Sequence, residues 1–296
     1  MIRRTMKEVS KIRYREVIPV LNSLSKKNIP YAIIKGEPLS IDAYGEEGMR
    51  RSGDIDLLIS LKNTAVVRDE LLSYGFESKN NNREHQVAAI TTTNQSIPFR
   101  KTVDEMRIEV DLNHDIFLGE LTGKRVNVDD FISDVKDVKI YGYSAKTIPC
   151  IKSFLLLTLH HYYEFNSIYI ISLGKNKMSF NMLRDVFFLW KNNKDIISNN
   201  LYDISCKHNV VPYVYYILYY TNKIFNDNEF ALLVEKFETE EGVGLLHCYG
   251  LSEAERKTWK VDFFTRLNNE YAFDLIKYDL TVADKEKLER ARAIFG

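Results

Sequence analysis

The spacing of hydrophobic positions in the first part of the chain switches between helical and extended periods. Apolar residues recur at helical spacing over residues 9–26, which predicts an amphipathic helix. The short apolar run 31–34 that follows is typical of a buried strand. Up to residue 75, the pattern further predicts a helix at 38–44, a strand that begins with Asp54-Ile55-Asp56, and a helix at 63–74.

Beyond residue 75 the pattern favours strands. The segments 76–78, 85–92 and 97–103 are predicted to form an antiparallel set joined by polar turns. Residues 107–112 alternate strictly between apolar and charged side chains, so the two kinds occupy opposite faces of the predicted strand. The apolar face carries Ile108, Val110 and Leu112, and the charged face carries Arg107, Glu109 and Asp111.

Helical spacing replaces strand alternation from Cys150 onwards. The segment Thr147-Ile148-Pro149 marks the change, so two domains are predicted, at 1–148 and 149–296. The expected fold class is α+β: a mixed sheet with flanking helices, followed by a mainly helical C-terminal domain.

Composition narrows the function classes. The 41 basic and 41 acidic side chains cancel, so no net positive field recruits a nucleic acid. The three cysteines are scattered and odd in number, which disfavours a secreted disulfide scaffold. The N-terminus lacks the apolar core of a signal peptide, and the longest apolar stretches are too short to span a bilayer. These features predict a cytoplasmic protein that does not enter a membrane.

Two carboxylates stand at alternate positions of one predicted strand. Asp54 and Asp56 therefore point to the same side, with about 7 Å between their Cα atoms, while Ile55 points into a core. Like charges side by side are costly to bury unless a cation or hydrogen-bond donors compensate them. Hard divalent cations do so, and Mg²⁺ typically takes one or two carboxylates together with substrate phosphates.

The order of these pieces resembles the nucleotidyltransferase superfamily, which has the fold of DNA polymerase beta. That superfamily carries a glycine turn after a first strand, Asp-x-Asp on the next strand and a third carboxylate on a later one. More specifically, the chain resembles a bacterial group of uncharacterised nucleotidyltransferase-like proteins. The matching segments are Ile34-Lys35-Gly36, Tyr44-Gly45, Arg50-Arg51, Asp54-Ile55-Asp56 and Val110-Asp111-Leu112. The sequence departs from the patterns at Glu37, where the superfamily usually has a small residue, and at Asn113-His114, where the group has His-Trp.

The resemblance implies a metal-dependent site in the 1–148 domain. Asp54, Asp56 and Asp111 would be the catalytic carboxylates and would hold Mg²⁺, with two ions expected and Mn²⁺ as an alternative. Glu109 competes with Asp111 for the third position because both share one face. Lys35, Gly36, Arg50 and Arg51 would bind the nucleotide phosphates, and which of the two arginines does so stays open.

The implied function is transfer of a nucleoside monophosphate from a nucleoside triphosphate to a hydroxyl or other nucleophile, with release of pyrophosphate. The acceptor would be a small molecule, a peptide or a protein rather than a nucleic acid. One alternative is a nucleotide-binding regulatory or partner-binding module without turnover. Another is a toxin-type nucleotidyltransferase that acts on tRNA or protein.

His160-His161 is the remaining pair of chemically versatile side chains, and it lies on a predicted helix. A zinc site needs further ligands at fixed spacing, and no other Cys or His stands nearby. We therefore expect one of the two histidines to pack or cap within the helical domain. The alternative is that the pair lines the pocket for the acceptor or the base.

Overall fold

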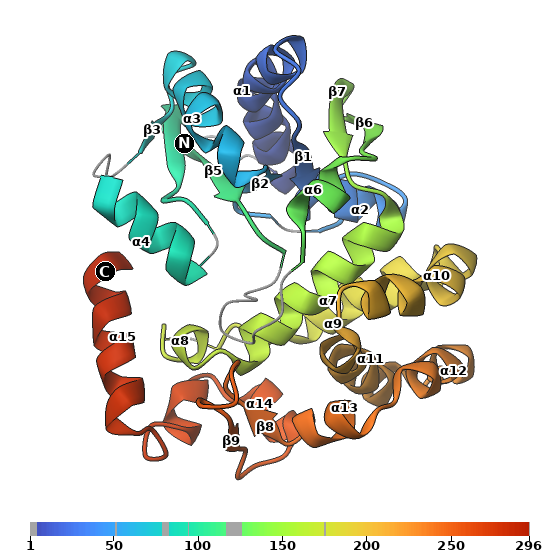
Figure 1. Cartoon of the computed structure of the whole chain (residues 1–296). Helices are drawn as coiled ribbons and strands as arrows, with labels where there is room; N and C mark the ends of the chain where they lie inside the picture. Colours follow the sequence, from blue (N-terminus) through green and yellow to red (C-terminus); the bar gives the residue numbers. More distant parts are fainter. Residues whose placement is uncertain are drawn as a thin grey trace. The chain divides into compact units, whose positions relative to one another are not determined.

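The computed structural model describes residues 5–50, 52–78, 83–93, 95–116, 126–174 and 176–295 (Figure 1). These residues form two compact units. One unit runs to Ile116 and also contains Asn127–Ser153, and the other contains the chain from Phe154 onwards. The domain boundary between residues 148 and 149 stays a prediction.

The first unit combines a sheet with helices. Its elements, in chain order, are α1 (Met6–Lys26), β1 (Ala32–Ile34), α2 (Gly36–Tyr44), β2 (Ile55–Leu58), the 3-10 helix η1 (Leu61–Asn63), α3 (Thr64–Ser73), β3 (Glu77–Ser78), α4 (Arg83–Thr93), β4 (Phe99–Val103), β5 (Met106–Asn113), α6 (Val128–Ile132), β6 (Lys136–Ile140) and β7 (Tyr143–Thr147).

The strands form one mixed sheet of seven strands in the order β3-β4-β5-β2-β1-β7-β6. Strand β2 lies near its centre, antiparallel to β1 and parallel to β5. Strand β1 is parallel to β7 on its other side. The α+β fold class expected from the sequence is confirmed.

One face of this sheet carries the hydrophobic core of the first unit. Ile55 and Leu57 of β2 are buried there with Val110 of β5, and all three are at most 2% exposed. Helices α1 and α3 cover this face (Figure 1). A stripe of apolar side chains at helical spacing on the two helices packs into the core, as expected for amphipathic helices on a sheet. The stripe consists of Val17, Leu21, Leu24, Val67 and Leu71. Because side chains alternate along a strand, Asp56 and Asp111 point to the opposite face.

The segment 85–92 is a helix, not the strand predicted from its sequence. It belongs to α4, whose β-branched residues at its C-terminal end favoured an extended prediction. Tertiary contacts explain the outcome. The Gln86 side chain donates to Ser78 Oγ (3.2 Å) and accepts from the backbone N–H of Ile97 (3.2 Å), so one turn of helix is fixed between β3 and the approach to β4.

The second unit is mainly helical, as predicted. Its elements are α7 (Cys150–Asn166), α8 (Ile168–Ile171), α9 (Phe180–Lys191), α10 (Lys194–Lys207), α11 (Val211–Phe225), α12 (Asn228–Phe237), α13 (Glu240–Leu245), β8 (Cys248–Tyr249), β9 (Lys257–Thr258), α14 (Phe263–Asn268), the 3-10 helix η2 (Ala272–Leu275) and α15 (Val282–Phe295).

Helix α11 is the central element of this unit. Helices α9, α10, α12 and α13 all pack against it. Its residues from Val211 to Leu218 are all buried, so the tyrosines of this segment are packing groups. Strands β8 and β9 pair as a short antiparallel ribbon, and Tyr249 and Trp259 beside it anchor a second hydrophobic cluster.

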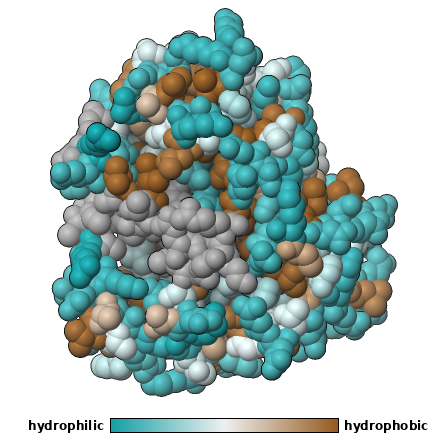
Figure 2. Space-filling view, in the orientation of Figure 1, coloured by the Kyte–Doolittle hydropathy of each residue, from teal (hydrophilic) through white to brown (hydrophobic). Residues whose placement is uncertain are grey.

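On the face shown in Figure 2, hydrophilic residues cover most of the described surface, and hydrophobic residues form small separate patches. Such scattered exposed apolar residues are normal for a globular protein. Among the described helices, none is both long and apolar enough to cross a membrane.

Candidate active site

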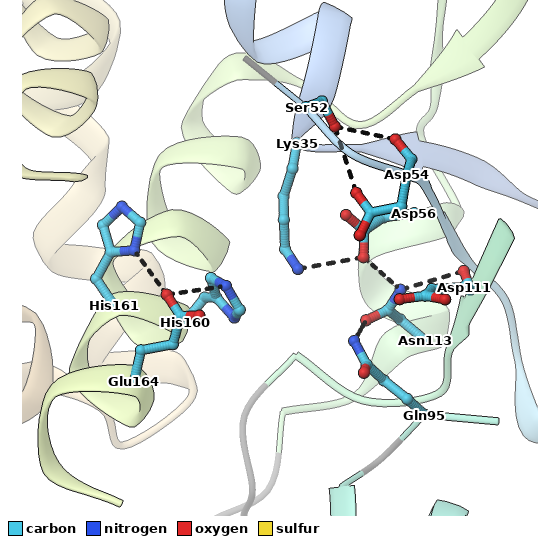
Figure 3. A network of polar contacts seen from close by, with 10 residues as sticks. All are labelled: Lys35, Ser52, Asp54, Asp56, Gln95, Asp111, Asn113, His160, His161 and Glu164. Atoms are coloured by element: carbon cyan, nitrogen blue, oxygen red, sulfur yellow. Dashed lines mark hydrogen bonds and ion pairs between the residues drawn. The ribbon is translucent and has the colours of Figure 1, made fainter. Parts of the chain in front are cut away.

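The central strands bring the predicted carboxylates together. In the parallel pairing of β2 with β5, Asp56 is directly opposite Asp111. Residues in register on neighbouring strands point to the same face, so the two carboxylates are neighbours. Asp54 lies just before β2, where Ser52 Oγ donates to its carbonyl oxygen (2.9 Å) and to its Oδ1 (3.3 Å) (Figure 3).

Asp56 is held by charge and by hydrogen bonds. Its Oδ1 pairs with Lys35 Nζ at 3.3 Å, and only 9% and 10% of the two side chains are exposed. Asn113 Nδ2 donates to the same oxygen (3.1 Å), and Gln95 Nε2 donates in turn to Asn113 Oδ1 (2.7 Å) (Figure 3). No sequence motif predicted a role for Asn113 or Gln95. The strand alternation already placed Asn113 on the face of Asp111, two residues further on, and this signal could have identified it.

Asp111 has the most perturbed carboxyl group of the site. Burial raises its pKa to about 8, and the charges of Asp56, Asp54 and Glu109 add to the effect. Its Oδ1 is buried and accepts no hydrogen bond from any residue that the structure describes. Burial and the charge of Asp56 also raise the pKa of Asp54. Three carboxylates thus share too little positive charge, and a buried oxygen is left without a donor. This is the environment that a divalent cation with oxygen ligands would satisfy.

Glu109, the competing candidate, lies in a different environment. Arg100 Nε lies 2.8 Å from its Oε2, and Arg107 Nη2 lies 3.3 Å from the same oxygen. Two arginines already compensate this carboxylate, whereas Asp111 has no ion pair with an arginine in the described part of the chain. The geometry therefore favours Asp111 over Glu109 as the third ligand.

The Lys35-Gly36 turn joins β1 to α2 with an unusual backbone. Lys35 has φ +57° and ψ −142°, a region that side-chain-bearing residues rarely occupy, and Gly36 follows with φ +43°. A Cβ on Gly36 would make only ordinary contacts, the nearest at 3.6 Å to Ser52 Oγ, so the positive φ rather than space favours glycine. The turn directs Lys35 to Asp56 and places the first backbone N–H groups of α2 beside it.

Glu37 points away from this turn, as its charge requires. It is only 2% exposed and accepts hydrogen bonds from Tyr141 Oη (2.9 Å), the backbone N–H of Gly48 (2.7 Å) and Ser10 Oγ. The carboxylate that replaces the usual small residue therefore ties α2 to α1, to the loop that follows α2 and to the turn between β6 and β7. It repels no phosphate from this position.

Removing the Glu37 carboxylate should destabilise the first unit. Glu37→Ala leaves one buried donor (Ser10) and two partly buried donors (Gly48 and Tyr141) without their acceptor. A buried donor left unsatisfied costs roughly 1–3 kcal/mol, so we expect the free energy of unfolding to fall by about 2 kcal/mol or more. Urea unfolding followed by circular dichroism measures this loss. Glu46→Ala is the matched control in the same loop, since Glu46 is exposed and should change stability by less than about 0.5 kcal/mol. Equal unfolding curves for the two variants would contradict the anchoring role.

Arginines approach the same region from two directions. Arg13 of α1 donates to the carbonyl oxygen of Ser52 (2.6 Å). Burial lowers its pKa, and the charge of Asp54 opposes that shift, which places its guanidinium near the first carboxylate. No pattern in the sequence distinguishes Arg13 from the other polar positions of its helix. Arg50 has its backbone N–H bonded to Ser40 Oγ (3.3 Å), and Arg51 lies outside the described residues.

The His-Trp pair of the bacterial group is replaced by Asn113 and His114, which point to different faces. Asn113 orients Asp56, while His114 Nε2 lies 2.8 Å from Ser96 Oγ. Burial lowers the pKa of His114 to about 4, so the ring is neutral at physiological pH. The substitution leaves the three carboxylates in place.

Comparisons with known proteins found one matching family and several similar solved structures. A family model described as uncharacterised nucleotidyltransferase matches residues 3–226. The crystal structure of ANT(2'')-Ia in complex with adenylyl-2''-tobramycin is similar at 10% sequence identity and a TM-score of 0.39, over 67% of this chain and 97% of that one. An antigenic nucleotidyltransferase-like protein from Paracoccidioides brasiliensis is similar at 16% identity and a TM-score of 0.38, over 68% and 91% of the two chains. No curated protein sequence matches the chain.

Proposed function

The chain belongs to the uncharacterised nucleotidyltransferase family, and we propose that it transfers a nucleoside monophosphate from a nucleoside triphosphate to a nucleophile, with release of pyrophosphate. The observation that carries the proposal is the in-register pair Asp56 and Asp111 beside Asp54, with one buried oxygen lacking a donor. The acceptor would be a hydroxyl or other nucleophile on a small molecule, a peptide or a protein. The balanced net charge disfavours a nucleic acid.

The donor set fits Mg²⁺, with Mn²⁺ as an alternative. Asp54, Asp56 and Asp111 would hold one or two ions through carboxylate oxygens, which hard cations prefer. When bound, such ions neutralise phosphate charge and stabilise the attacking and leaving oxygens of a phosphoryl transfer. The unpartnered oxygen of Asp111 and the raised pKa values of Asp54 and Asp111 support this assignment.

The chain's own residues would bind the triphosphate and move one proton. Lys35 and the backbone N–H groups at Gly36 lie at a helix N-terminus, which favours anionic phosphate. The acceptor oxygen forms a new bond to the α-phosphorus as the bond to the β-phosphate oxygen breaks, and pyrophosphate leaves. Asp111 would accept the proton of the attacking group, because a bound cation would keep its carboxylate ionised and an ionised carboxylate can act as a general base. In this proposal the residues that carry out the reaction lie in the 1–148 region. The protein would act in the cytoplasm, which is consistent with the three cysteines being free thiols.

The test is transfer of label from nucleotide to acceptor. The full chain is incubated with each α-labelled nucleoside triphosphate, Mg²⁺ and a cell extract separated into small-molecule, protein and nucleic-acid fractions. Label in the small-molecule or protein fraction, together with released pyrophosphate, is the expected result. Binding of the triphosphate without any turnover would overturn the proposal in favour of a binding module, and label confined to tRNA would overturn the acceptor assignment.

The arginine loop provides a separate prediction. Arg51→Ala should weaken triphosphate binding by roughly 1.5–3 kcal/mol, the range for hydrogen bonds to charged groups, and should weaken monophosphate binding less. Arg50→Ala should have the smaller effect, because Arg51 is one residue closer in sequence to the strand that carries Asp56. Titration of both ligands against both variants measures this. Equal losses of affinity for the triphosphate and the monophosphate, or no loss of affinity in either variant, would show that the arginines do not contact the phosphates and are only surface charges.

A further inference from the structure

Helix α7 carries a cluster of metal-binding side chains that the proposed reaction does not use. His160 and Glu164 are four residues apart, and His161 and Glu164 are three apart, so both histidines reach one carboxylate (Figure 3). His160 Nε2 lies 3.4 Å from Glu164 Oε2, and His161 Nδ1 lies 3.9 Å from the same oxygen. A zinc site needs more than two protein ligands, and no further Cys or His stands near the pair in the sequence. The carboxylate of Glu164 can be the third ligand.

The distances suit a small tetrahedral ion. Zinc binds nitrogen and carboxylate oxygen at about 2.0–2.2 Å, so neighbouring ligand atoms in a tetrahedral site are separated by about 3.4 Å. One ligand atom from each of the three residues lies within 4.8 Å of the others. Rotations about the side-chain bonds of Glu164 and His160, which are 23% and 27% exposed, suffice to close the remaining gap.

The environment provides both a fixed ligand and an open side. His161 is 1% exposed, and its ring stacks on Phe165, with the planes within 9° of each other, which fixes its orientation. His160 and Glu164 keep contact with solvent, so water can complete the coordination shell. Zinc sites with three protein ligands and a water are typical of catalytic rather than structural zinc.

We propose that His160, His161 and Glu164 form a second metal site, for a divalent transition ion of the zinc class with one exchangeable position. Two imidazoles and one carboxylate select such an ion over Mg²⁺, which prefers oxygen ligands alone. The two sites therefore differ in ligand chemistry, and this one does not depend on nucleotidyl transfer.

Calorimetric titration of the full chain with Zn²⁺, in excess Mg²⁺ so that the hard-cation site is filled, tests the proposal. We expect one zinc equivalent, bound at least about tenfold more weakly in His160→Ala and in Glu164→Gln. His247→Ala and Cys206→Ser are matched controls, since both residues are exposed and outside the cluster. Circular dichroism of each variant checks that the fold is intact.

The controls also separate the possible sources of a zinc signal. Undiminished binding in His160→Ala and Glu164→Gln, or no binding by the unmodified chain, would overturn the site. Loss of binding in Cys206→Ser would assign the ion to a thiol, and loss in Asp56→Asn would assign it to the carboxylates near Lys35. Either outcome overturns the proposal and leaves the proposed transfer reaction unaffected.

Discussion

Asp56→Asn should lower the rate of nucleotidyl transfer by about 10³-fold or more, equivalent to roughly 4 kcal/mol of transition-state stabilisation. The variant keeps the shape of the side chain but removes the charge that would bind Mg²⁺. Asp56 is also the carboxylate that Lys35 and Asn113 hold in place, so no neighbouring group can take over its position.

The same substitution separates catalysis from folding. Asp56→Asn leaves Lys35, which is 10% exposed, without its ion-pair partner, so the metal-free variant should be less stable than the unmodified chain. Asp54→Asn should also abolish transfer, but it relieves repulsion and need not destabilise the fold. Steady-state transfer assays and urea unfolding of both variants measure the two effects. Near-normal transfer by either variant with Mg²⁺ present would contradict the metal assignment.

Asp111→Asn should remove transfer to a similar extent while leaving much of the triphosphate affinity, because in the proposed site Asp54 and Asp56 would still hold the metal that binds the phosphates. Glu109→Gln is the matched control on the same strand face, since its carboxylate is paired with Arg100 and Arg107. A lower transfer rate in Glu109→Gln than in Asp111→Asn would show that the third ligand is Glu109.

The raised pKa of Asp111 adds a dependence of stability on pH. Its pKa is about 8 in the folded state against 3.8 for the ordinary group. Between these values the folded state holds a proton that the unfolded state has lost, so the free energy of unfolding falls as pH rises from about 4 to about 8. One proton corresponds to a slope of up to about 1.4 kcal/mol per pH unit.

This dependence of the free energy of unfolding on pH applies to the metal-free protein. Below pH 4 both states are protonated and Asp111 contributes its full stability, whereas above pH 8 that stability is lost. Asp111→Asn should flatten the slope, and added Mg²⁺ should stabilise the unmodified chain most at the alkaline end, because the ion no longer competes with a proton. Thermal unfolding across this range with and without Mg²⁺ tests both statements. An identical pH profile for Asp111→Asn would show that Asp111 ionises normally.

The sequence predicted the parts of the site that follow from strand periodicity. The alternation around Asp54-Ile55-Asp56 and along residues 107–112 established which side chains share a face, and the structure places Asp56 opposite Asp111. It did not predict pairing partners, because register between strands depends on contacts distant in sequence. For the same reason the link from Gln95 through Asn113 to Asp56 was not foreseen.

Predictions from local secondary-structure propensity were wrong where tertiary contacts determine the secondary structure. The Thr-rich end of α4 favoured a strand, but hydrogen bonds of Gln86 to two neighbouring segments stabilise a helix there. Glu37 departs from the superfamily pattern, and no local signal in the sequence indicates that Tyr141, roughly a hundred positions away, completes its set of donors. The grouping of Glu164 with His160 and His161 was readable from helix spacing, once carboxylates are counted as zinc ligands.

The central place of β2 in the sheet has a consequence for how the first unit responds to denaturant. Its amides and carbonyls are bonded to β1 on one side and β5 on the other, and Ile55 and Leu57 lie in the core. Such a strand exchanges its amide hydrogens only when much of the sheet opens. We therefore expect Asp56 and Asp111 to be positioned by the most slowly exchanging part of the unit, so that binding of a nucleotide would order little further there. Loss of the carboxylate geometry in rising urea should coincide with loss of the sheet, not precede it.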